Sequence, residues 1–176
     1  MVQLIIGNKG KGKTKYLLEK VNSEVKEILG NICYLDKSTK HMFDLNNRVR
    51  LINVSDFMIE NTDQFIGFIC GIISQDHDLE QMYFDSFLKV AKLEGKDITD
   101  TINRIRKISE KFDVNFFISI SIDEADVPDD LKELIAVALW FRKITKGALG
   151  IVVFPRLISL FTSGSAHKLY NRSGLY

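Results

Sequence analysis

The segment that most constrains this chain lies close to its N-terminus, at residues 7–14. Its sequence, GNKGKGKT, fits the phosphate-binding (Walker A) pattern G-x-x-x-x-G-K-[ST] at every fixed position. The apolar run 2–6 precedes it and a stretch with helical period follows it, so we expect a strand, a loop and a helix in that order. The loop residues expected to bind a nucleotide are Gly7, Asn8, Lys9, Gly10, Lys11, Gly12, Lys13 and Thr14.

The physical chemistry of this pattern explains why it binds phosphate. Glycines take backbone conformations that other residues avoid, so consecutive N–H groups can turn inward, and the following helix points the positive end of its dipole at the same place. Lys13 adds a positive charge near the β- and γ-phosphates, and Thr14 offers a hydroxyl to Mg²⁺. The other interpretation is a basic glycine-rich turn without a ligand. Because both the pattern and its flanks match, the sequence favours a nucleotide site with ATP and Mg²⁺ as cofactors.

Composition places the chain among ordinary globular proteins. It has 176 residues, of which 45% are hydrophobic and 27% charged, enough for one domain with a core. Cys33 and Cys70 lie in apolar surroundings and are predicted to be small core residues of a reducing compartment. His41, His77 and His167 show no metal-ligand spacing. The net charge of +1 gives no global basic field, so nucleic acid is not an expected partner.

Two further features bear on location. The N-terminus enters the expected strand at once and lacks a basic n-region, so we expect no signal peptide and a cytoplasmic protein. Residues 62–74 are too short to span a bilayer, and Pro155 and Arg156 interrupt the apolar run near the C-terminus, so we expect no transmembrane segment. Within residues 62–74, Gly67 and Gly71 share one helix face, which predicts close packing of that helix on a sheet.

Segments with strand character alternate with segments of helical period over residues 1–133. The expected strands are 2–6, 31–36, 48–53, 79–85 and 114–122, and the expected helices are 12–29, 62–74, 86–93 and 99–112. Asp126 followed by Pro128 predicts a further helix that runs to about residue 145. The alternation predicts an α/β fold, the three-layer P-loop NTPase fold, with a mostly parallel sheet and helices on both faces. In such sheets, ligands bind beyond the carboxyl ends of the strands.

A site of this type needs a carboxylate at the end of another buried strand, where it holds Mg²⁺. Asp85 and Asp123 both follow an expected strand, although each could instead cap a helix or belong to a turn. The sequence favours Asp85. Strand 114–122 can then lie between the P-loop strand and the acid strand and present a polar sensor at its tip, for which Ser119, Ser121 and Asp123 are candidates.

Four motifs carry a resemblance to a known family: GNKGKGKT, then YLDKS at 34–38, YFDSF at 83–87 and FISISID at 117–123. Together they resemble small RecA-like P-loop ATP-binding proteins of clostridia-like bacteria, often labelled twitching-motility ATPases. The similarity covers roughly residues 1–133. The resemblance implies that residues 7–14 are the phosphate loop and that Asp85 is the Mg²⁺-associated acid.

The chain departs from the RecA-like pattern at one place. RecA-like hydrolases usually carry a catalytic glutamate just beyond the second strand, whereas this chain reads Asp36-Lys37-Ser38-Thr39 there. Two interpretations stay open: Asp36 replaces the glutamate, or hydrolysis is slow or absent. The second domain and the histidine and acidic boxes of retraction motors are not found in the sequence.

The C-terminal part differs in charge from the rest. Residues 134–176 contain six Lys and Arg but no Asp or Glu, which leaves residues 1–133 with a net charge of −5. Residues 149–154 could form an extra strand and 157–161 a short helix. The segment is either a genuine extension of the sheet or a poorly ordered, non-native tail. We therefore divide the chain into a nucleotide-binding domain, 1–133, and a basic extension, 134–176.

Three functions follow from these features. The first is an Mg-ATP-binding NTPase with weak or regulated hydrolysis that controls an assembly, either with an unidentified protein partner or as an oligomer. The second is a small-molecule or nucleoside kinase, for which no arginine-rich lid motif is found. The third is a non-hydrolysing, nucleotide-gated scaffold, which the missing glutamate favours. The predicted catalytic residues are Lys13, Asp85, Ser121 and Asp123, and the predicted metal ligands are Thr14 and Asp85.

Overall fold

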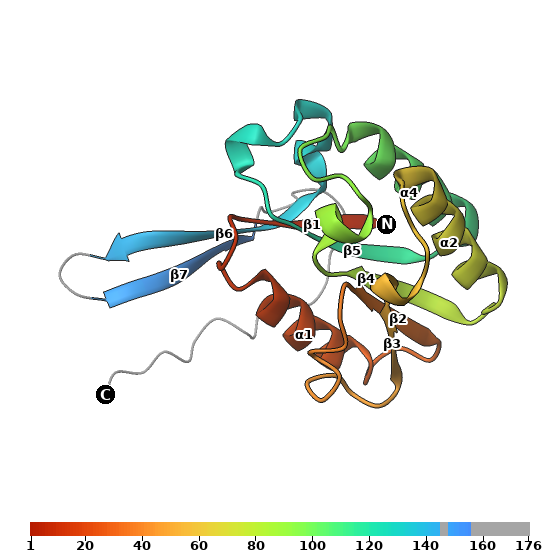
Figure 1. Ribbon diagram of the computed structural model, residues 1–176. Coiled ribbons are helices and arrows are strands. Elements are labelled where there is room, and N and C mark those ends of the chain that lie inside the picture. The colour runs from red at the N-terminus through yellow and green to blue at the C-terminus, as the bar shows by residue number, and fades with distance from the viewer. Residues whose placement is uncertain (145–147, 156–176) are drawn as a thin grey trace, which may run out of the picture.

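The computed structural model describes residues 1–144 and 148–155. A seven-stranded sheet runs through the centre of the molecule, in the order β3-β2-β4-β5-β1-β6-β7 (Figure 1). Strands β1 to β6 are parallel, and β7 runs antiparallel to β6. The strands are β1 (Val2–Ile6), β2 (Asn31–Asp36), β3 (Val49–Asn53), β4 (Leu79–Phe84), β5 (Asn115–Ile120), β6 (Ile135–Ile144) and β7 (Ala148–Pro155).

Helices cover both faces of this sheet, as the fold class predicted from the sequence requires. One face carries α1 (Lys13–Glu24), and the other carries α2 (Thr62–Ser74), α3 (Phe87–Val90) and α4 (Thr99–Phe112) (Figure 1). The result is the predicted three-layer α/β arrangement, so that prediction is confirmed.

Alternation along the strands divides the buried side chains into two cores, because successive residues of a strand point to opposite faces. The core under α1 includes Ile5, Ile32, Tyr34, Tyr83 and Phe117. The core under α2, α3 and α4 includes Leu4, Cys33, Leu35, Phe84 and Phe116. Strands buried on both faces read as continuous apolar runs, which is why β1, β2, β4 and β5 could be recognised in the sequence.

The predicted helix over residues 126–145 is wrong. The chain forms two short 3₁₀ helices, η2 (Glu124–Asp126) and η3 (Asp129–Leu134), and then enters β6. β6 pairs in parallel with β1, with Ile135 opposite Leu4 and Val137 opposite Ile5. The helix-start signal does begin a helix, but only the short η3. The apolar residues that follow gain more stabilisation by pairing with the open edge of β1 than by continuing that helix.

The sheet therefore continues past residue 133, although the division of the chain there stays a prediction. The expected strand at 149–154 is confirmed as β7, whereas the expected helix at 157–161 lies outside the described residues. No helix in the described ranges is long and apolar enough to cross a membrane. Helix α1 ends at Glu24 instead of Leu29, because the chain turns over residues 25–27.

The close packing predicted for Gly67 and Gly71 is also wrong. Helix α2 has the predicted bounds, and its Phe65, Ile69 and Ile73 are buried. Both glycines lie on its exposed face, and a methyl group added at either would meet nothing within 4 Å. The glycines therefore do not bring the helix close to the sheet.

Candidate functional site

The loop between β1 and α1 has the backbone conformation that its glycines predict. Gly7, Gly10 and Gly12 have φ values of +143°, +82° and +86°, which side-chain-bearing residues rarely adopt. Gly12 precedes the first residue of α1, so the helix begins directly at the loop. The unpaired N–H groups of the first helical turn and the positive end of the helix dipole therefore face the edge of the sheet where the parallel strands end.

Gly7 is held between two strands. Its N–H donates a hydrogen bond to the carbonyl of Ile122, just beyond β5, at 3.2 Å. A Cβ at this position would lie 2.6 Å from the carbonyl oxygen of Leu139 in β6. The start of the phosphate loop is thus packed directly against the strand that the sequence had predicted as a helix.

Lys13 lies inside the loop and is only 7% exposed. Its Nζ donates hydrogen bonds to the carbonyl oxygens of Gly7, at 2.6 Å, and Asn8, at 3.0 Å. Burial lowers the pKa of Lys13, and the negative charge of Asp85 opposes that shift. The ammonium group is therefore fixed at the loop, within electrostatic reach of the acid at the end of β4.

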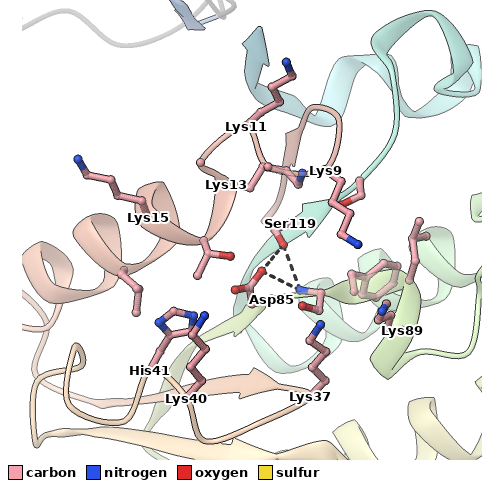
Figure 2. Close-up of a pocket in the computed structure, with 18 of the residues that line it drawn as sticks. Lys9, Lys11, Lys13, Lys15, Lys37, Lys40, His41, Asp85, Lys89 and Ser119 are labelled. Atoms are coloured by element: carbon pink, nitrogen blue, oxygen red, sulfur yellow. Dashed lines mark hydrogen bonds between the residues drawn. The ribbon is translucent and has the colours of Figure 1, made fainter. Parts of the chain in front are cut away.

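Asp85 follows β4 and is 4% exposed. Its Oδ1 accepts hydrogen bonds from the Ser119 hydroxyl and the Ser86 N–H, each at 2.7 Å (Figure 2). Its Oδ2 accepts a longer bond from the Tyr34 hydroxyl at 3.4 Å. One carboxylate oxygen is thus firmly held and the other only loosely, so the second retains lone pairs for a further ligand.

Asp36 ends the neighbouring strand β2 and is 3% exposed. Burial raises its pKa, and the nearby charge of Asp85 raises it further, while hydrogen bonds from the Lys37 N–H and from Ser86 lower it. The Lys37 N–H lies 2.7 Å from Asp36 Oδ1. Because parallel strands end at the same edge of the sheet, β2 and β4 bring these two carboxylates together.

A cavity of about 1050 Å³ opens above this edge. It brings together Lys13, Thr14, Asp85 and Ser121 of the predicted site, with Lys9, Gly10, Lys11 and Gly12 of the loop. Asp123 is not among the lining residues. It accepts a hydrogen bond from the Asn8 side chain at 3.3 Å and another from the Ala125 N–H at 3.2 Å.

The structure adds to the predicted site in three places. Tyr34 reaches Asp85 from the middle of a buried strand, and a tyrosine in such a run carries no sequence signal for a site. Ser119 had been considered as a sensor, but its buried hydroxyl is occupied by Asp85. The loop after β2 follows a strand end, where the sequence predicted ligand binding, but no role had been given to its lysines and histidine, which also line the cavity.

Comparisons with known proteins bear on the fold. Neither the models of protein families nor the curated proteins contain a match to this chain. Among solved structures, it is similar to a KaiC-like protein from the hyperthermophilic archaeon Pyrococcus horikoshii, with a TM-score of 0.67 and 13% sequence identity. The match covers 88% of this chain and 78% of that chain. At this identity the likeness shows the fold, which is the RecA-like P-loop fold.

Proposed function

We propose that this chain binds Mg-ATP at residues 7–14 and hydrolyses it slowly or under the control of a partner, so that the nucleotide state governs an assembly. The observation that carries the proposal is the position of Lys13 and Asp85. Both are buried charged groups at one cavity, one inside a glycine loop at a helix start and one at the end of a nearby strand. Buried opposite charges around a phosphate-binding loop suit a metal-bound triphosphate.

The residues present fit Mg²⁺. The ion prefers oxygen ligands and keeps several waters, so one hydroxyl and one carboxylate are sufficient protein partners. Thr14 lines the cavity, and Asp85 lines it with one loosely held oxygen, so these two would hold the ion. When bound, Mg²⁺ neutralises charge on the β- and γ-phosphates. Ser121, which is exposed in the cavity, and Asp123, through Asn8, are proposed to respond to the γ-phosphate.

Asp36 supports slow turnover. It is the carboxylate at the end of β2, where a water-orienting acid is needed, yet it is almost fully buried and does not line the cavity. One of its oxygens is already occupied by the Lys37 N–H. Water can reach it only after a local rearrangement, and a rearrangement of this kind is what a protein partner or a second copy of the chain would supply. If that rearrangement never occurs, the protein binds ATP without hydrolysing it and acts as a nucleotide-gated scaffold.

The test of nucleotide binding is the substitution Lys13→Ala, measured with a fluorescent ATP analogue and Mg²⁺. We expect binding to be lost, because the substitution removes the only buried cation among the described residues that line the cavity. Lys26→Ala is the matched control, since Lys26 is exposed and lies outside the cavity. Unchanged affinity in Lys13→Ala would refute the assignment.

Turnover is tested separately by phosphate release from the wild type and from Asp36→Asn. A further loss in Asp36→Asn would identify Asp36 as the water-orienting group, whereas equal, near-zero rates would favour the scaffold. A cytoplasmic location, oligomer formation and kinship with the clostridial ATP-binding proteins belong to the same proposal. No feature of the site indicates a role in twitching motility, and such a role would have to be tested in the living organism.

A further inference from the structure

The cavity has a second basic wall that the phosphate loop does not explain. Lys37, Lys40 and His41 of the loop after β2 point into it from the side of Asp85 opposite residues 7–14, and Lys89 of α3 enters from an adjacent side (Figure 2). The Walker A pattern requires one lysine, Lys13. We use "second wall" for Lys37, Lys40, His41 and Lys89.

The loop that carries Lys37, Lys40 and His41 of the second wall is held in place. The side chain of Asn22 in α1 donates to the carbonyl of Asp44 at 2.7 Å and accepts from the N–H of Asn46 at 2.8 Å. The Ser55 hydroxyl donates to the carbonyl of Lys37 at 2.8 Å. His41 is fixed by a contact of 2.9 Å between its Nδ1 and Asp44 Oδ2. The side chains of Lys37 and Lys40 therefore project from a loop that hydrogen bonds hold in place.

The lysines of the second wall are not neutralised within the described part of the chain. Lys20 and Lys132 pair with Glu24 and Asp129, but Lys37, Lys40 and Lys89 form no ion pair with any described residue. Cations that converge on one cavity repel each other unless an anion lies between them. The carboxylates of Glu19, Asp44, Asp85 and Glu94 also line the cavity, but none of them forms an ion pair with these three lysines, so unpaired positive charge remains at this place.

The position of the wall indicates what it could bind. A triphosphate held by residues 7–14, with its metal at Thr14 and Asp85, would occupy the side of the cavity nearest the phosphate loop. The cavity of about 1050 Å³ is slightly larger than the range of about 300–1,000 Å³ for sites that hold one small ligand. Space and charge are thus left on the far side of Asp85.

We propose that the second wall binds a second small ligand that carries phosphate and lies beside the nucleotide. Phosphate matches the lysines, which are compact cations with three donors each. The net charge of −5 over residues 1–133 favours a small ligand over a nucleic acid, whose long backbone would meet that negative surface. The placement of this ligand beside a nucleotide rests on the proposed nucleotide site. The presence of the second wall is independent of that proposal.

The experiment is a titration of inorganic pyrophosphate into the protein saturated with Mg²⁺ and a fluorescent, non-hydrolysable ATP analogue. We expect saturable calorimetric binding without displacement of the fluorescent nucleotide. In the double variant Lys37→Ala/Lys40→Ala, pyrophosphate affinity should fall at least about tenfold, since each lysine contributes a charge-assisted hydrogen bond. Nucleotide affinity should stay within about twofold. Lys26→Ala/Lys107→Ala removes the same charge at exposed positions outside the cavity and should change neither affinity.

Three results would overturn the inference. These are no binding of pyrophosphate to the loaded wild type, an equal loss of nucleotide affinity in Lys37→Ala/Lys40→Ala, or tighter binding of a single-stranded oligonucleotide than of pyrophosphate. Nucleotide affinity is recorded before pyrophosphate is added, so a failure of the proposed nucleotide site is seen separately. In that event, pyrophosphate is titrated into Lys13→Ala. Binding there that still depends on Lys37 and Lys40 supports the second wall, and its absence refutes it.

Discussion

Gly7→Ala is the substitution that tests most directly how the phosphate loop is built into the sheet. The added methyl carbon would lie 2.6 Å from the carbonyl oxygen of Leu139 and 3.3 Å from its Cβ. The first distance is shorter than real Cβ contacts, and the opposing atom belongs to the backbone of β6, which cannot swing aside as a side chain can. The φ of +143° adds strain for any residue with a side chain.

The magnitude follows from these two effects. Backbone strain at positive φ costs about 1–2 kcal/mol, and forcing a methyl group into a filled site costs about 1–3 kcal/mol more. Gly10→Ala is the matched control, because Gly10 lies in the same loop at φ +82° but has nothing within 4 Å of the added carbon. Gly10→Ala should therefore lose only strain energy. The further loss in Gly7→Ala contains about 1–3 kcal/mol from the contact with β6, together with the greater strain at φ +143°.

Urea unfolding without nucleotide, followed by circular dichroism, gives both free energies of unfolding. For a chain of this size, the extra loss in Gly7→Ala corresponds to a melting temperature about 2–12 °C below that of Gly10→Ala. Amide hydrogen exchange should also accelerate at Val137, Ala138 and Leu139 in Gly7→Ala only. Equal destabilisation of the two variants would refute the packing of the loop against β6.

Three further predictions concern the edge of the sheet and the cysteines. Ser119→Ala removes the hydroxyl that holds Asp85 and should weaken Mg²⁺-dependent binding of a fluorescent ATP analogue about tenfold, with Mg²⁺-free binding unchanged; equal loss in both conditions would contradict it. The pKa of Asp36 is raised by burial, so the folded state holds a proton after the unfolded state has released it. The contribution of Asp36 to wild-type stability should therefore fall as pH rises from the ordinary aspartate value through the raised one. Urea unfolding of Asp36→Asn across that range should lack this fall, and parallel pH profiles would argue against it. Burial raises the pKa of Cys33 to about 11, so iodoacetamide at pH 8 should label the half-buried Cys70 first, as measured by peptide mass spectrometry; similar labelling rates would show that Cys33 is accessible.

The order of the central strands could be predicted from the sequence because it depends on strong local signals. The P-loop pattern identifies β1, and continuous apolar runs identify β4 and β5. The expected fold then places β5 between β1 and β4, and this order is observed. The same order brings Asp85 and Ser119 to adjacent strand ends, where they form a hydrogen bond. The role of Asp85 as a metal ligand stays a prediction.

Residues 126–145 show where sequence signals stop being sufficient. Asp126, Pro128 and the acidic residues after them are good helix-start signals, and a short apolar run has no period that separates helix from buried strand. The interaction that makes this segment a strand is not local. One edge of β1 is paired with β5, and the other edge needs a second strand to satisfy its backbone hydrogen bonds. Backbone hydrogen bonds and apolar contacts with β1 outweigh the helix that η3 begins.

The second wall was missed for a similar reason. Lys37, Lys40 and His41 stand in a polar stretch that was predicted as a loop, and nothing local indicates that Asn22 in α1 and Ser55 after β3 hold it in place. The contacts join residues about 20 positions apart, so only the tertiary structure turns a polar connection into one side of a cavity.

The contact between Gly7 and Leu139 also changes how the C-terminal part relates to the nucleotide. The sequence left open whether that part extends the sheet or forms a poorly ordered tail. Its first strand pairs with β1 and packs against Gly7 of the phosphate loop without room for a methyl group. Beyond the pairs with β1, β6 continues with β7 away from the rest of the sheet (Figure 1). A partner that binds this ribbon and displaces β6 would remove the backbone against which Gly7 packs. By linkage, a nucleotide that favours one position of the loop then favours one position of the ribbon to the same extent. The proposed control of an assembly by nucleotide thus has a short physical route, from phosphate through Gly7 to β6.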